Sequence, residues 1–207
     1  MTHVVVVGAG PGLGAAYAQR FLADGADVTL LSRSPQDLAT RVGARAWPVD
    51  AADQEQLAEA LTQLDASQPV DVLVFNAVTV HPGPLTERTS EELRQELAVG
   101  VEAAWTCVRA LLPRMRERGG GTLLFTGGGA ATFAVTGMGF LSPVKAALRM
   151  LVLSLARELE GGPVRVATLT IAAAVGQGGI DSAVVADQAA AVVREGGPVE
   201  VRLPEAR

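Results

Sequence analysis

The chain has 207 residues, 49% of them hydrophobic, and its 17 basic and 22 acidic residues give a net charge of −5. This length suits a single α/β domain over residues 1–207, with enough apolar material for a sizeable core. The acidic balance weighs against nucleic acid or an anionic membrane as a partner.

The sequence also bears on the compartment. Cys107 is the single cysteine and cannot form an internal disulfide, which favours a reducing environment. No basic, strongly apolar leader precedes the valines at 4–7, so we expect no signal peptide and a cytoplasmic protein. Residues 122–144 carry no charge, but five glycines and Pro143 favour a loop beside a strand over a membrane helix. We expect neither a membrane segment nor a metal site.

Short apolar runs alternate with helical patterns along the chain. The expected strands are residues 3–7, 27–31, 44–48, 70–75, 121–126, 164–171 and 199–203. The expected helices are residues 12–24, 35–42, 52–65, 89–117, 143–160 and 181–195. This βαβ repetition predicts an α/β fold of the Rossmann type: a doubly wound, mostly parallel, seven-stranded sheet between two layers of helices.

A glycine-rich loop joins the first strand to the first helix. It reads Gly8-Ala9-Gly10-Pro11-Gly12-Leu13-Gly14. Glycines there permit a tight turn and close approach of the backbone to a ligand, and a helix N-terminus favours an anion. In this position the loop predicts a dinucleotide pyrophosphate site made by Gly8, Gly10, Gly12, Leu13 and Gly14. The alternative is that these glycines only pack the helix against the strand.

The end of the second strand indicates which dinucleotide is bound. It reads Leu30-Leu31-Ser32-Arg33-Ser34, without the carboxylate that commonly binds the ribose hydroxyls of NAD. Arg33 can pair with a 2′-phosphate, and Ser32 can donate a hydrogen bond. We therefore expect NADP(H) to be preferred over NAD(H), the alternative being that Arg33 is a solvated loop residue.

Motifs after the loop resemble those of the short-chain dehydrogenase/reductase family over about residues 3 to 203. Asp50 resembles the family's aspartate beside the adenine ring, and Asn76-Ala77 its Asn-Ala-Gly turn, with Val78 in place of the glycine. Lys145 resembles its active-site lysine. The resemblance implies oxidoreductase chemistry with a nicotinamide dinucleotide.

The resemblance ends at the other catalytic positions. Family members use an asparagine, a serine and a tyrosine together with the lysine. At the corresponding positions this chain has Gly100, Gly128 and Leu141, and Tyr17 is its single tyrosine. Because leucine and glycine cannot donate a proton, we expect reduction of ordinary ketones by the family mechanism to be severely impaired.

Two side chains are candidates to replace the missing groups beside Lys145. His81 follows the fourth strand and has an ordinary pKa near neutrality, as an acid or base requires, although it could equally be a solvated loop histidine. Ser142 is next to the lost tyrosine position and could bind a substrate oxygen or cap the following helix.

The segment before that helix is strongly apolar. We expect the substrate cavity to be lined by side chains from this segment and from the fifth strand: Thr126, Gly128, Phe133, Met138, Phe140 and Leu141. An apolar small molecule would suit such a cavity, but the same side chains could instead pack against a partner subunit.

Two functions remain open at this point. One is an NADP(H)-dependent enzyme with a noncanonical mechanism, either redox or a redox-neutral isomerisation, cyclisation or elimination. The other is an inactive family member that binds NADP(H) as a regulatory or scaffolding subunit. For either, the resemblance implies a homodimer or homotetramer formed through helices 89–117 and 143–160. The helical spacing of Val101, Trp105 and Val108 suggests a second apolar face that agrees with this.

Overall fold

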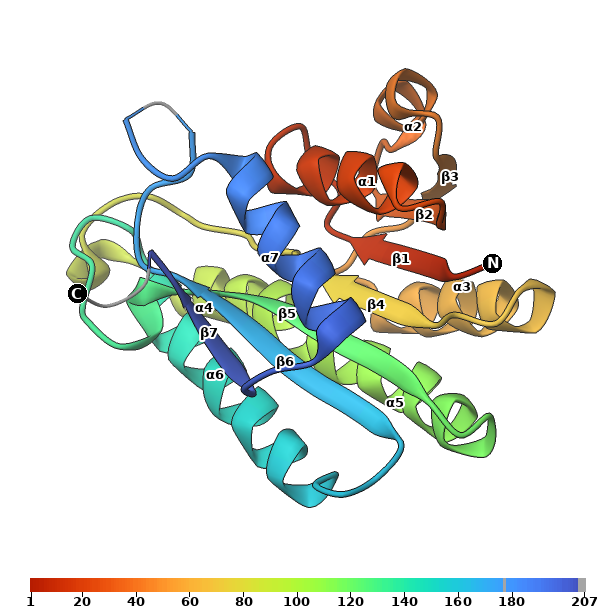
Figure 1. The fold of residues 1–207 in the computed structure, drawn as a ribbon. Coiled ribbons are helices and arrows are strands. Elements are labelled where there is room, and N and C mark those ends of the chain that lie inside the picture. The colour runs from red at the N-terminus through yellow and green to blue at the C-terminus, as the bar shows by residue number, and fades with distance from the viewer. Residues whose placement is uncertain (177, 205–207) are drawn as a thin grey trace.

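The computed structural model describes residues 1–176 and 178–204. Their strands form one sheet in the order β3-β2-β1-β4-β5-β6-β7, and every neighbouring pair is parallel (Figure 1). The strands are β1 (His3–Val7), β2 (Asp27–Ser32), β3 (Arg45–Pro48), β4 (Val72–Phe75), β5 (Gly121–Gly128), β6 (Val164–Ile171) and β7 (Glu200–Leu203). The predicted seven-stranded, doubly wound sheet is confirmed, and it is wholly parallel.

Helices cover both faces of this sheet (Figure 1). On one face lie α1 (Leu13–Ala23), α2 (Gln36–Val42) and α7 (Ser182–Glu195). On the other lie α3 (Gln54–Ser67), α5 (Ala103–Glu117) and α6 (Leu141–Glu158), with α4 (Ser90–Leu97) leading into α5. Alternate residues of β1 enter the two cores, which is why its valines form an unbroken apolar run. No helix in the described ranges is long and apolar enough to cross a bilayer.

The strand order reverses between β1 and β4. The chain leaves β1 toward α1 on one face, whereas it reaches β4 from α3 on the other. Connections that diverge in this way leave a crevice at the carboxyl ends of the two strands, where ligands bind in open α/β sheets. The topology therefore places the glycine loop and the segment after β4 at one site.

The predicted helix 89–117 is interrupted. A π-helical turn, η2 (Ala98–Glu102), separates α4 from α5, and Gly100 lies within it. A Cβ atom at Gly100 would overlap Cγ1 of Val144, which is almost fully buried on α6. The position that resembles the family's asparagine is therefore filled by a neighbouring side chain.

The predicted outer face of this helix is only partly correct. Trp105 is 45% exposed and Val101 half-buried, but Val108 is 1% exposed and packs in the core beneath α5. The three residues do not form one exposed apolar stripe, because Val108 lies on the side of α5 that packs in the core.

The contact between Gly100 and Val144 predicts a coupled stability effect. Gly100→Asn should lower the unfolding free energy by about 1–3 kcal/mol, because the added side chain overpacks the core. Combined with Val144→Ala, the loss should be smaller than the sum of the two single losses, since the shortened residue leaves room. Urea unfolding of the wild type and the three variants measures this coupling, and strictly additive losses would contradict the packing described.

Candidate functional site

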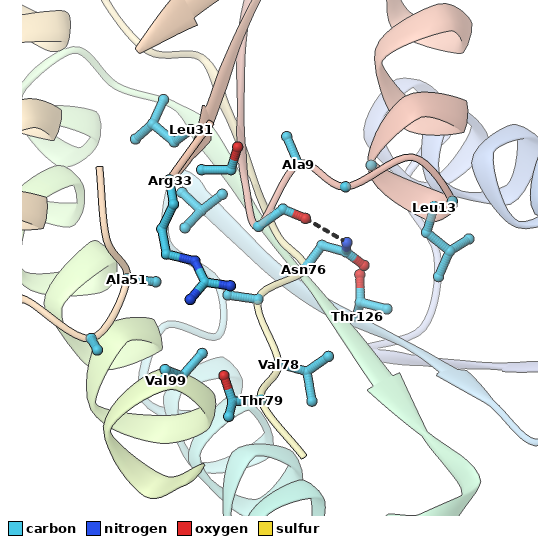
Figure 2. Close-up of a pocket in the computed structure, with 18 of the residues that line it drawn as sticks. Ala9, Leu13, Leu31, Arg33, Ala51, Asn76, Val78, Thr79, Val99 and Thr126 are labelled. Carbon is cyan, nitrogen blue, oxygen red and sulfur yellow. Dashed lines mark hydrogen bonds between the residues drawn. The ribbon is translucent and has the colours of Figure 1, made fainter. Parts of the chain in front are cut away.

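A cavity of about 960 Å³ opens at the carboxyl ends of the strands (Figure 2). Its walls come from the loops after β1, β2, β3 and β4 and from the start of α6. The structure brings most of the sequence-predicted site residues to this one cavity: Gly8, Gly10, Gly12, Leu13, Gly14, Ser32, Arg33, Asp50, Asn76, Ala77, His81, Thr126 and Lys145.

Two of the loop glycines serve packing. Gly8 has φ +82°, and a Cβ there would overlap the backbone of Ala77 at the end of β4. Asn76 locks this approach, because its Nδ2 donates a 2.9 Å hydrogen bond to the Gly8 carbonyl (Figure 2). At Gly14 a Cβ would lie 2.7 Å from Cα of Ala9, so α1 packs directly on the loop.

The other two loop glycines face open space. A Cβ at Gly10 or Gly12 would meet no atom within 4 Å, and both residues line the cavity. Gly12 is the N-cap of α1, and no side chain caps the helix there. A bare backbone at an uncapped helix N-terminus is suited to a pyrophosphate. Packing and ligand binding are thus divided among the glycines.

The far end of the cavity carries the groups that would distinguish dinucleotides. Figure 2 shows the Arg33 side chain extending from the end of β2 into the cavity. It is exposed, and no ion pair involving it is recorded in the described ranges. Asp50 accepts a 2.9 Å hydrogen bond from the Ala52 amide at Oδ1, which fixes its carboxylate at the cavity wall. These residues suit the adenosine end of a nicotinamide dinucleotide.

Lys145 is almost fully buried at the inner wall. Its Nζ donates a 2.9 Å hydrogen bond to the carbonyl of Thr126 on β5, and no carboxylate pairs with it in the described ranges. Burial lowers the pKa of Lys145 to about 8. The Thr126 hydroxyl pairs with the Tyr17 hydroxyl at 3.1 Å, and burial raises the pKa of Tyr17 to about 12. The single tyrosine is therefore a neutral core residue.

Because the Lys145 ammonium group is buried, replacing it with an apolar side chain should stabilise the protein. Lys145→Met should raise the unfolding free energy at pH 7 by about 1–3 kcal/mol, because a pKa lowered by burial means that the charged form destabilises the fold. Below pH 8 Lys145 is protonated in both the folded and the unfolded wild type, so the full free-energy cost of burying the charge is present. Above pH 8 the folded wild type loses this proton before the unfolded chain does. The stability difference between the variant and the wild type should therefore become smaller. Denaturant melts at pH 7 and pH 9.5 check this, and a variant less stable at both would contradict it.

His81 has a partner that the sequence did not reveal. Oε1 of Glu96 accepts a 2.9 Å hydrogen bond from the His81 amide and lies 3.2 Å from its ring Nδ1. Glu96 is fully buried on α4, whereas the imidazole is 29% exposed and lines the cavity. Helical spacing could have pointed to this partner in the sequence. Glu96 shares the inner face of its helix with Leu93 and Gly100, and a carboxylate on such a face is unusual.

Ser142 lies elsewhere. Its hydroxyl accepts a 3.0 Å hydrogen bond from the Val135 amide and donates a 3.5 Å one to the Phe133 carbonyl. The capping alternative is wrong, because α6 begins at Leu141 with Phe140 as its N-cap and no side-chain cap. Ser142 holds the loop after β5 in place and does not line the cavity that contains Lys145.

The apolar residues expected at the substrate are also separated from Lys145. Phe133 is 54% exposed and lines a second cavity of about 820 Å³, between the loop after β5 and the 3₁₀ helix η1 (Leu85–Glu87). Met138, Phe140 and Leu141 line neither cavity. At Gly128 a Cβ would lie 3.9 Å from Cε of Lys145, so a side chain would fit where the family's serine is expected.

The comparisons with known proteins agree with this geometry. The family described as short chain dehydrogenase matches residues 2–188, and the chain belongs to this family. Its sequence is 32% identical over 168 residues to 2,3-dihydro-2,3-dihydroxybenzoate dehydrogenase of Escherichia coli K12, covering 79% of this chain and 65% of that enzyme. The aligned parts of other curated relatives span from 37% to 69% of their length.

Solved structures give the same fold. A short-chain dehydrogenase from Streptomyces avermitilis superposes with a TM-score of 0.87 at 27% identity, over 98% of this chain and 88% of that one. A metagenomic short-chain oxidoreductase in complex with NADP superposes with a TM-score of 0.89 at 26% identity, over 98% and 96% of the two chains.

Proposed function

We propose that the protein is an NADP(H)-dependent oxidoreductase acting on an apolar small molecule, with His81 as the proton donor in place of the missing tyrosine. One observation carries the proposal: a single cavity joins the glycine loop and Arg33 to Lys145 and to a histidine backed by a buried carboxylate. Apolar parts of the cavity wall support the substrate class, and they comprise Val78, Val99, Ile171, Ala173 and Val175.

Each residue has a defined part in the proposed reaction. Gly10, Gly12 and the N-terminus of α1 hold the pyrophosphate, and Arg33 holds the 2′-phosphate. Bound NADPH would supply the hydride to a carbonyl carbon. His81 then gives its proton to the carbonyl oxygen, so that an alcohol and NADP⁺ result. Lys145 holds a hydroxyl of the dinucleotide through the Nζ protons left after its bond to Thr126.

A non-catalytic role is the second candidate. It is favoured by Gly100, whose space Val144 occupies, and by Leu141, which stands where the family's tyrosine would be and lines neither of the two cavities described above. On this alternative the protein binds NADP(H) without turning over a substrate, so binding and reaction must be measured separately.

The cofactor preference tests the first part of the proposal. NADPH should bind about 10- to 100-fold more tightly than NADH, because a charge-assisted hydrogen bond from Arg33 contributes about 1.5–3 kcal/mol. Arg33→Ala should abolish most of that difference. Arg41→Ala, which removes an exposed charge on α2 outside the cavity, should leave it intact. Fluorescence titrations of the three proteins give three pairs of dissociation constants, and equal affinities in the wild type would refute the assignment of Arg33.

The chemistry is tested in a single turnover. Protein loaded with NADPH is mixed with a panel of apolar ketones and aldehydes, and the loss of the NADPH absorbance is followed. His81→Asn should slow any reaction about 10²- to 10⁴-fold with unchanged NADPH affinity, because asparagine keeps the backbone bond to Glu96 but has no acidic proton to give.

Ser142→Ala is the matched control, because Ser142 lines only the second cavity, and it should leave the rate unchanged. A wild type that binds NADPH but oxidises none of it in the presence of the panel would favour the non-catalytic role. A reaction that His81→Asn does not slow would place the proton donor elsewhere.

A further inference from the structure

Three segments meet at the carboxylate of Glu96. The side chain comes from α4, its hydrogen-bond partner His81 lies in the loop after β4, and Gly139 approaches from the loop before α6. A Cβ at Gly139 would overlap the His81 carbonyl oxygen and lie 3.0 Å from Glu96 Oε1, and its φ of +51° is one that glycine adopts readily. The carboxylate is thus enclosed by backbone.

Backbone hydrogen bonds hold the two loops together at this place. The Gly83 amide donates to the Gly137 carbonyl at 2.9 Å, and the Gly139 amide donates to the Gly83 carbonyl at 3.2 Å. The backbone of His81 is fixed in addition by its own amide bond to Glu96. With the backbone held on both sides, the ring orientation is set by its remaining contact, which is Nδ1 to Oε1 of Glu96.

The other charged groups beside His81 are engaged with each other. Arg88 Nη1 lies 3.0 Å from Glu92 Oε1, and Glu92 also closes the N-terminus of α4 by accepting from the Thr89 amide. In the described ranges, Glu96 is therefore the carboxylate that pairs with the His81 ring. Its second oxygen, Oε2, is buried and has no hydrogen-bond partner there, so the contacts of the carboxylate are made at Oε1.

We propose that Glu96 is a positioning residue that keeps the neutral His81 ring in its Nδ1–H tautomer, with Nε2 as the nitrogen that exchanges protons in the cavity. The reason is that an ionised carboxylate only accepts hydrogen bonds, so the nitrogen facing it carries the hydrogen. The ring then gains and loses its proton at Nε2. The catalytic use of this arrangement rests on the proposed function, whereas the tautomer of His81 can be measured whether or not a reaction occurs.

The tautomer is read directly by NMR of protein labelled with ¹⁵N-histidine. At the high-pH plateau of its titration, where the imidazole is neutral, His81 should show the nitrogen shifts of the Nδ1–H form. In Glu96→Leu, whose side chain offers no acceptor to Nδ1, the ring should move toward the Nε2–H form that free histidine prefers.

The chain contains two histidines, and the other is an internal reference. The ring of His3 is buried, with Nδ1 3.1 Å from the Gln68 carbonyl and Nε2 2.9 Å from the Thr29 hydroxyl, so it should be Nδ1–H in both proteins. Glu91→Gln is the control variant, because Glu91 is exposed on the same helix and pairs with Arg94. It should leave the spectrum of His81 unchanged.

The outcomes separate this inference from the proposed function. A wild-type His81 in the Nε2–H form overturns it, and this measurement needs no variant to fold. An Nδ1–H form that persists in folded Glu96→Leu also overturns it. If the tautomer changes as expected, the inference stands even where single turnovers show no reaction, and in that case only the proposed function fails. Where a reaction occurs, Glu96→Leu should lower kcat with unchanged NADPH affinity.

Discussion

The structure depends on the close approach of the loop after β1 to the end of β4. At Gly8 the two backbones are too near for any side chain, and the Asn76 amide closes the contact. Since β1 and β4 are also the strands between which the sheet order reverses, this contact fixes the floor of the cavity. Arg33 and Lys145 lie at the two sides of the cavity. Arg33 follows β2, which is next to β1, and Lys145 on α6 is bonded to Thr126 of β5, which is next to β4.

The two ends of the cavity differ in what lines them: exposed backbone at one end and buried charged side chains at the other. The dinucleotide end consists mainly of backbone, with open space over Gly10 and Gly12, and its polar side chains reach solvent. At the other end lies Lys145, buried with no carboxylate paired to it in the described ranges, and a fully buried carboxylate lies behind the His81 ring. Burying charged groups costs folding free energy, and such groups are common at functional sites.

Much of the fold could be predicted from the sequence, because parallel strands buried on both faces read as apolar runs and the glycine loop marks the first turn. The π-helical turn at Ala98–Glu102 was missed, since one extra residue leaves no mark on a helical pattern. Glu96 was missed because a glutamate in a helix is ordinarily exposed. The directions of Ser142 and Phe133 depend on how the loop after β5 folds back, and no local pattern encodes that.

Val144 makes the departure from the family's catalytic pattern hard to reverse. Its methyl group occupies the space above Gly100, so an asparagine at that position cannot be accommodated until the neighbour is smaller. A smaller residue at 144 on its own leaves a void in the core. Either of these two substitutions alone therefore lowers the stability of the fold. Positions 100 and 144 are thus coupled by packing, so that the effect of a change at one depends on the residue at the other.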